Sequence, residues 1–208
     1  MDKLFNKINP KEQKKLLKLF ESNVYNYKKN TNILSTIKDN IIGIVLDGCV
    51  QIIRTDYNGN RTIIEELDKG MLFGSVIYSL SSDECTIIAK EDTKTLIIEY
   101  ERIINSNNNN YPYYNQFIKN LLVITTNIIN EKNERIEILT KKTIRDKLLE
   151  YFNINIKKYA GRTLYLPFSL TDLSDYLAVD RSAMSRELKH LKEEGFISTK
   201  GRKITLLY

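Results

Sequence analysis

The apolar residues between positions 33 and 104 fall in short runs that are broken by glycine or aspartate. The runs are IIGIVLDGCVQIIRTD, RTIIEELDKG, CTIIAKED and TLIIEYERII, and they are rich in isoleucine, valine and threonine. These residue types favour extended backbone, so the runs predict short strands. Asn58-Gly59 separates two of the runs and is typical of a tight hairpin turn. Short strands with turns about every ten residues predict an antiparallel barrel or roll.

A long helical pattern begins at Pro112, after the polar connector NSNNNN at 105–110. Its apolar residues alternate three and four positions apart, which is the spacing of a coiled-coil seam. A second stripe lies beside the first, so the helix needs two partners, its own roll and a second copy of the chain. A helix buried within one domain is the alternative. The expected dimer seam is Tyr114, Phe117, Leu121, Ile124 and Ile128, and the second stripe is Ile118, Leu122, Ile129 and Ile136.

The last third of the chain has the pattern of a winged helix-turn-helix. Residues 143–158 predict a helix and residues 163–168 predict a short strand. In the segment 169–197 two short amphipathic helices flank the turn Ala178-Val179-Asp180, which predicts a helix-turn-helix. Ser169 can cap the first of these helices, and Gly195 ends the second. The segments FIST, KGRK and ITLLY then predict a small hairpin, the wing.

The outward face of the second of these helices carries the residues suited to DNA. The N-terminal residues of a recognition helix meet base edges in the major groove, and arginine there can donate two hydrogen bonds to guanine. Short serines allow the helix to approach the phosphates closely, and basic residues at the wing tip can reach the backbone. The expected DNA-contacting residues are Arg181, Ser182, Ser185, Arg186 and Lys189 on the helix, with Lys200, Arg202 and Lys203 on the wing.

The distribution of charge supports a polyanionic partner for the same third of the chain. The net charge is +6. Residues 141–208 hold 14 Lys and Arg against 8 Asp and Glu, whereas the first 140 residues hold 18 of each. The whole basic excess therefore lies in the last third, as nucleic-acid binding would require. A basic face that serves only solubility remains the alternative.

Few residues suited to catalysis or metal binding are present. Two cysteines, Cys49 and Cys85, cannot supply the ligands of a zinc site or an iron–sulfur cluster, and we expect both to be reduced and buried. The single histidine, His190, leaves little for histidine-based catalysis. The sequence contains no phosphate loop and no nucleophile motif. We therefore expect no enzyme, no catalytic residue, no metal and no cofactor.

The N-terminal pattern indicates where the protein acts. MDKLFNKINPKEQKKLLKLF is an amphipathic, lysine-rich helix pattern without a small-residue cleavage site. No stretch approaches the roughly 18 apolar residues of a membrane span. We expect a cytoplasmic protein with no membrane partner.

The order of these elements resembles the cyclic-AMP receptor protein (Crp/Fnr) family over nearly the whole chain, and VDRSAMSRELKHLKEEGFI is its most specific stretch. The resemblance implies an α+β fold: an antiparallel, jelly-roll-like cyclic-nucleotide-binding roll at 1–110, a dimerisation helix at 111–139 and a winged helix-turn-helix at 140–208. It places Arg181, Ser182 and Arg186 at bases and Ser169 and Thr171 at phosphates. It also implies a homodimer on a two-fold symmetric operator in double-stranded DNA, and RNA polymerase is a further candidate partner. The glycines at the family's turns are Gly43, Gly48, Gly59, Gly70 and Gly74.

The effector pocket that the resemblance implies lacks its characteristic residues. Ser75 stands where cyclic-nucleotide binders have a glutamate for the ribose, and Asp83-Glu84-Cys85 occupies the neighbourhood of the phosphate-binding arginine. Acidic residues there would repel a cyclic phosphate. We expect a degenerate pocket at Gly74, Ser75, Asp83, Glu84 and Thr86 that does not bind cyclic nucleotides. An unidentified uncharged or apolar small-molecule effector, or none, is left.

Two functions are therefore weighed. The first is a homodimeric, sequence-specific DNA-binding transcription regulator. The second is a roll that binds a partner protein, with the winged helix as an interaction surface. The concentration of charge in residues 141–208 and the two arginines on the recognition helix favour the first.

Overall fold

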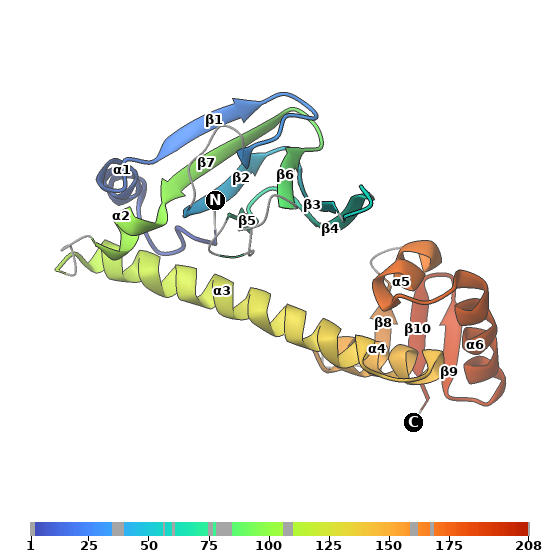
Figure 1. Ribbon diagram of the computed structural model, residues 1–208. Coiled ribbons are helices and arrows are strands. Elements are labelled where there is room, and N and C mark those ends of the chain that lie inside the picture. The colour runs from blue at the N-terminus through green and yellow to red at the C-terminus, as the bar shows by residue number, and fades with distance from the viewer. Residues whose placement is uncertain are drawn as a thin grey trace. The chain divides into compact units, whose positions relative to one another are not determined.

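A computed structural model describes residues 3–34, 40–55, 57–59, 61–74, 77, 85–105, 110–158, 162–166 and 169–207 (Figure 1). The chain forms two compact units, Met1–Thr126 and Asn127–Tyr208. Among the described residues, no helix combines the length and the apolar character that crossing a membrane requires.

The first unit contains the predicted antiparallel roll. Its strands form a four-stranded sheet of order β1-β7-β2-β5 and a three-stranded sheet of order β4-β3-β6. Isoleucines and valines of both sheets, together with Phe73, form a shared buried cluster, as expected for strands whose side chains alternate between two faces. The strands are β1 (Asn23–Tyr27), β2 (Ile41–Asp47), β3 (Val50–Thr55), β4 (Arg61–Leu67), β5 (Leu72–Phe73), β6 (Cys85–Ala89) and β7 (Thr93–Glu99).

The predicted turn glycines fall into two groups. Gly48, Gly59 and Gly70 have positive φ angles and lie between strands, as predicted. Gly43 does not lie at a turn. It lies within β2 opposite Phe73, and a Cβ atom at this position would come within 2.2 Å of the Phe73 ring. The glycine is therefore needed for close packing inside the roll.

The two cysteines do not form a buried pair. In the antiparallel ladder of β3 and β6, Cys85 lies opposite Arg54, whereas Cys49 adjoins the other end, where Val50 lies opposite Ala89. Both thiols are free. Cys49 is buried, and burial raises the pKa of its thiol, but Cys85 is only half-buried.

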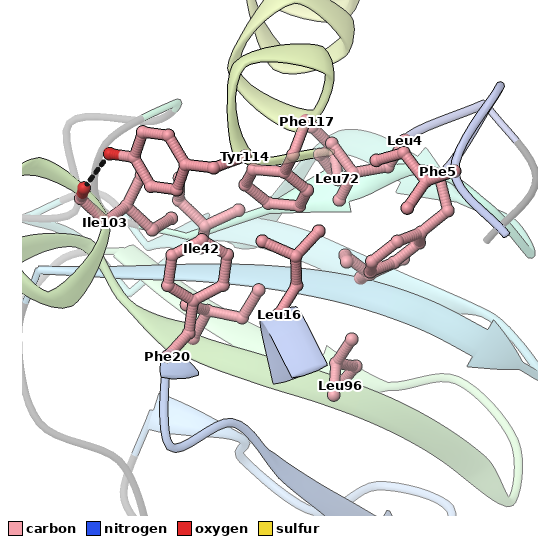
Figure 2. Close-up of a cluster of buried hydrophobic side chains, with 13 residues drawn as sticks. Leu4, Phe5, Leu16, Phe20, Ile42, Leu72, Leu96, Ile103, Tyr114 and Phe117 are labelled. Atoms are coloured by element: carbon pink, nitrogen blue, oxygen red, sulfur yellow. Dashed lines mark hydrogen bonds between the residues drawn. The ribbon is translucent and has the colours of Figure 1, made fainter. Parts of the chain in front are cut away.

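A second apolar cluster covers the other face of the four-stranded sheet. It lies between this sheet and three helices: α1 (Pro10–Leu19), α2 (Tyr100–Ile104) and the first turns of α3 (Pro112–Leu139). Figure 2 shows Tyr114 and Phe117 pointing from α3 toward Phe20, Leu16 and Ile42. The Tyr114 hydroxyl donates a hydrogen bond of 2.6 Å to the Ile103 carbonyl. The central strands β2 and β7 are therefore covered on both faces, which explains their runs of apolar residues, whereas the edge strand β1 is largely exposed.

The segment before α1 belongs to the same core. Leu4, Phe5 and Ile8 are buried in the cluster. The buried side-chain amide of Asn120, on α3, donates hydrogen bonds to the Leu4 carbonyl (2.9 Å) and the Asn6 carbonyl (2.8 Å). Because a buried amide is costly unless it is paired, these bonds hold the N-terminal segment on α3.

The two apolar stripes of α3 exist, but the partner predicted for part of the first stripe was wrong. Tyr114 and Phe117 are 5% and 0% exposed in the core of the first unit, where Leu121 and Ile124 also pack. These two aromatic residues are therefore not available to a second chain. Of the second stripe, Ile118 packs against the same core, whereas Leu122, Ile129 and Ile136 are 61%, 57% and 58% exposed.

The second unit packs the end of α3 and the helices α4, α5 and α6 with a small antiparallel sheet of order β8-β10-β9. Its core joins the inward faces of the helices and the sheet, including the predicted Leu148 and Phe152 and the C-terminal Ile138 of α3. The elements are α4 (Ile144–Lys158), β8 (Thr163–Tyr165), α5 (Leu170–Leu177), α6 (Arg181–Glu193), β9 (Ile197–Lys200) and β10 (Lys203–Leu206).

Candidate DNA-binding surface

The N-terminus of α5 is closed by a reciprocal cap. The Ser169 hydroxyl accepts a hydrogen bond from the Asp172 amide (3.2 Å) and donates to the Asp172 carboxylate (2.8 Å), which also accepts from the Ser169 amide (3.1 Å). These bonds lower the pKa of Asp172. The predicted phosphate contact Ser169 thus already has a structural role, whereas Thr171 is exposed in the first turn of the helix.

The turn between α5 and α6 is formed as predicted. Ala178 adopts a left-handed conformation, with φ 50° and ψ 58°, and the next amide, that of Val179, donates to the Ser174 carbonyl (3.0 Å). Asp180 then caps α6 by accepting from the Ala183 amide (2.8 Å) and the Ser182 hydroxyl (2.6 Å). These bonds lower the pKa of Asp180. The start of α6 is therefore fixed relative to α5.

The helix α6 has one buried and one exposed face. Met184 and Leu191 are buried on the inner side. The predicted DNA-contacting residues lie on the opposite side, within one stripe at helical spacing, and all are exposed. They are Arg181, Ser182, Ser185, Arg186 and Lys189. Lys189 has an exposed ion pair with Glu193 (3.7 Å), which is worth little in solution and leaves the lysine available.

The wing is the hairpin of β9 and β10, with Gly201 at a positive φ of 59° in its turn. Lys200 and Arg202 are exposed on either side of this glycine. The Arg202 Nε donates to the Leu166 carbonyl (3.2 Å), so the base of its guanidinium group is held in place. The Lys203 ammonium group lies 5.8 Å from the centre of the Tyr165 ring. The wing therefore presents Lys200 and Arg202 on the same domain as the exposed stripe of α6.

Two cations of α4 that hold the helix-turn-helix were not predicted from the sequence. The Lys147 ammonium donates to the Leu177 carbonyl at the end of α5 (3.1 Å). Arg145 forms a bidentate pair with Glu194, contacts Glu187 (3.4 Å) and lies 4.9 Å from the centre of the Phe196 ring. A signal was present: carboxylates at the C-terminus of a helix are unfavourable without a cation, and Glu193-Glu194 end α6.

Only part of the expected effector pocket falls within the described residues. Ser75, Asp83 and Glu84 lie outside them. Gly74 is buried with φ 124°, and a Cβ atom there would lie 2.1 Å from the Ile41 carbonyl oxygen. Thr86 is half-buried in β6 opposite Ile53. In the described part of the chain, no three His, Cys, Asp or Glu side chains are grouped so that they could bind a metal ion.

Family models match both units. Residues 26–106 match the cyclic nucleotide-binding domain, and residues 144–208 match the Crp-like helix-turn-helix domain. The chain belongs to the Crp/Fnr family. As a Crp/Fnr-type protein it is a DNA-binding transcription regulator, and it has the expected order of a nucleotide-binding-type roll, helices and a C-terminal helix-turn-helix.

Solved structures of Crp/Fnr-type proteins share the fold. The chain is similar to the catabolite activator protein of Thermus thermophilus, with 19% identity, a TM-score of 0.52 and 98% and 93% of the two chains covered. It is also similar to a CooA mutant from Carboxydothermus hydrogenoformans, with 19% identity, a TM-score of 0.59 and coverage of 91% and 85%. CprK in complex with OCPA gives 16% identity, a TM-score of 0.64 and coverage of 93% and 91%. No curated protein matches the sequence.

Proposed function

We propose that this Crp/Fnr protein binds a two-fold symmetric operator in double-stranded DNA as a homodimer, and that the exposed stripe of α6 contacts the bases. The observation that carries the proposal is the placement of Arg181, Ser182, Ser185 and Arg186 together on the solvent side of α6, opposite its buried face. The first turns of a recognition helix are the part that enters the major groove. Arginine in that position can form bidentate bonds with guanine.

A second set of residues would hold the backbone of the DNA. Thr171 near the start of α5 and Lys189 near the end of the stripe are exposed, as are Lys200 and Arg202 on the wing. Ser169 would contribute through the helix terminus that it caps, since the hydroxyl itself is engaged with Asp172. Phosphate contacts of this kind set orientation and register but carry no sequence information.

The experiment compares a base contact with a phosphate contact. Binding is measured by fluorescence anisotropy over a salt series with two probes. One is a duplex that the wild-type chain selects from a randomised library, and the other is a scrambled duplex. Arg186→Ala should weaken binding to the selected duplex by roughly 1–3 kcal/mol and relax its sequence preference. Lys200→Ala should weaken binding to both duplexes and reduce the salt slope by about 1, because one cation no longer neutralises a phosphate.

Lys15→Ala, which removes an exposed cation from α1, is the control and should change neither affinity. Unchanged affinity of Arg186→Ala for the selected duplex would remove Arg186 from the base-contacting set. Binding that does not depend on salt would contradict DNA binding by this surface.

We further propose three functional segments: a roll at 1–110, a dimerisation helix at 111–139 and a DNA-binding domain at 140–208. The exposed stripe of α3 supports the second segment. Leu122, Ile129 and Ile136 recur every seven residues, which is the repeat of a two-stranded coiled coil. One apolar face of α3 would then cover its own roll, through Tyr114 and Phe117, and the other face would cover the partner.

The roll would respond to something other than a cyclic nucleotide. The residues that would bind ribose and phosphate are replaced by Ser75 and by Asp83-Glu84-Cys85, and the absence of an arginine–phosphate pair is hard to offset. An unidentified uncharged or apolar effector, or a roll that senses nothing, fits this composition. RNA polymerase is the further partner that a regulator bound at a promoter would meet.

A further inference from the structure

Apolar contacts hold the inner face of α6 against its domain. Met184 and Leu191 are buried on the inner face of α6, and Leu188 is half-buried beside them. The free energy of apolar burial follows the area removed from water and is not directional. The turn and the Asp180 cap fix the start of α6. Directional contacts farther along the helix would therefore add most to fixing the angle at which α6 presents its outer stripe.

The guanidinium group of Arg145 supplies directional contacts from α4. Both of its terminal nitrogens bond to the Glu194 carboxylate, with Nη1 at 3.0 Å from Oε1, and Nη1 lies 3.4 Å from Glu187 Oε1. Glu187 and Glu194 are seven residues apart, which is two turns or about 10 Å along a helix. Contacts at two points on one side of α6 constrain both its rotation and its tilt.

The same side chain reaches the strand that leads to the wing. The guanidinium carbon of Arg145 lies 4.9 Å from the centre of the Phe196 ring. Phe196 is itself tied to the domain, because its amide donates to the Leu191 carbonyl (2.9 Å) and its carbonyl accepts from the Leu207 amide (3.0 Å). Stacking against a ring favours the planar guanidinium group. One residue thus links α4, the end of α6 and the start of β9.

The carboxylates of this cluster are unfavourable without their cation. Glu194 follows the last turn of α6, where the helix dipole disfavours negative charge. The bonds from Arg145 lower the pKa of Glu194, which keeps it ionised and paired. Glu187 and Glu194 lie on the side of α6 away from the Arg181 and Arg186 stripe. Arg145 therefore acts on the stripe through the helix and not by contact with DNA.

We propose that Arg145 is a positioning residue for sequence recognition, whose planar fork fixes α6 at the angle that the operator requires. The proposal rests on the proposed DNA-binding function and adds a residue outside its contact surface. A change at Arg145 should then affect the sequence preference of DNA binding without affecting the affinity for DNA in general. The net charge that attracts any DNA should not depend on the fork, whereas the preference for one sequence should depend on it.

Arg145→Lys tests the proposal in the full chain, because lysine keeps the charge but has neither the bidentate geometry nor the planar group that stacks on Phe196. Affinity for the duplex selected with the wild-type chain should fall about tenfold, while affinity for the scrambled duplex should change less than about twofold. The matched control is Arg102→Lys. Arg102 also pairs with two carboxylates, those of Glu21 (2.7 Å) and Glu99 (3.1 Å), but lies in the first unit. The affinity of Arg102→Lys for the selected duplex and for the scrambled duplex should stay unchanged.

Glu194→Gln provides a second measurement. Its effect on sequence preference should overlap with that of Arg145→Lys, so the double variant should lose less than the product of the two single losses. Equal loss for both duplexes, together with a smaller folded fraction by circular dichroism, would show a merely structural role and overturn the proposal. Retained preference in Arg145→Lys with lost preference in Arg186→Ala would overturn the role of Arg145 alone. Retained preference in both variants would overturn the base-contacting set as well.

Discussion

At the scale of single residues, Ala178 carries a backbone conformation that its side chain disfavours. Its φ of 50° and ψ of 58° lie in the left-handed region. This region costs a residue with a Cβ atom about 1–2 kcal/mol, whereas glycine adopts it freely. Many helix-turn-helix turns have glycine at such a position. The alanine is tolerated because the amides of Ala178 and Val179 donate to the end of α5 and the Asp180 cap holds the start of α6.

Ala178→Gly should therefore stabilise the second unit. The gain should be about 0.5–1 kcal/mol in the free energy of unfolding, because relief of strain is partly offset by the greater freedom of glycine in the unfolded chain. Urea unfolding followed by circular dichroism measures it. Ala183→Gly, within α6, should instead lower the stability by about 0.5–1 kcal/mol. A lower stability of Ala178→Gly would show that the left-handed conformation carries no strain.

At the scale of elements, α3 is the helix whose periodicity was predicted correctly and whose partners were assigned partly wrongly. Periodicity shows that a helix has two apolar faces, but it does not show which partner covers each face. The aromatic residues Tyr114 and Phe117 complete the core beside Phe20. The smaller Leu122 and Ile129 are left exposed. Leu121 and Ile124, which are no larger, pack in the core with the aromatic residues, so the position of each residue around the helix, and not its size, decides its partner.

Ile129→Glu tests the exposed stripe as the dimer interface. Two charges would then enter the contact between the helices, one from each chain, and the dissociation constant of the dimer should rise on the order of a hundredfold. Analytical ultracentrifugation measures this change. Asn127→Glu introduces the same charge at an exposed position away from the stripe and should leave the dimer intact. A dimer that tolerates Ile129→Glu would place the interface elsewhere.

At the scale of the whole molecule, the two parts of the chain differ in net charge and in the binding residues that they carry. The basic excess lies in residues 141–208, and the first 140 residues have no net charge to attract a phosphate ligand. The Crp/Fnr membership of the chain rests on both units. The residues suited to DNA are exposed in the second unit, whereas the proposed replacement of the ribose- and phosphate-binding residues lies in the first.

Cyclic AMP and cyclic GMP should neither bind the full chain nor change its affinity for the selected duplex. The physical reason is the acidic Asp83-Glu84 pair where a phosphate-binding arginine is expected. Isothermal titration calorimetry with each nucleotide measures binding, and anisotropy with and without nucleotide measures the effect on DNA. A micromolar dissociation constant for either nucleotide would contradict the degenerate pocket.

Local patterns predicted most of the fold, and long-range contacts account for what they missed. The strands, the turn at Ala178 and the cap at Ser169 depend on residues close in sequence, so they could be predicted. The roles of Arg145 and Gly43 could not be, because each depends on a partner brought near only by folding. Arg145 meets Glu194 across 49 residues, and Gly43 makes room for the ring of Phe73.

The bonds from Asn120 to Leu4 and Asn6 have a consequence for the order in which the chain folds. They span 116 and 114 residues. During synthesis residues 3–8 are made before α3, yet the contact of Phe5 with Phe117 and the bonds from Asn120 cannot form until α3 has been made. Contacts of such separation form late and slowly, because a long loop must close first. Residues 3–8 are thus made before α3 but reach their places only after it, and until then Phe5 is open to capture by a chaperone or by a neighbouring chain.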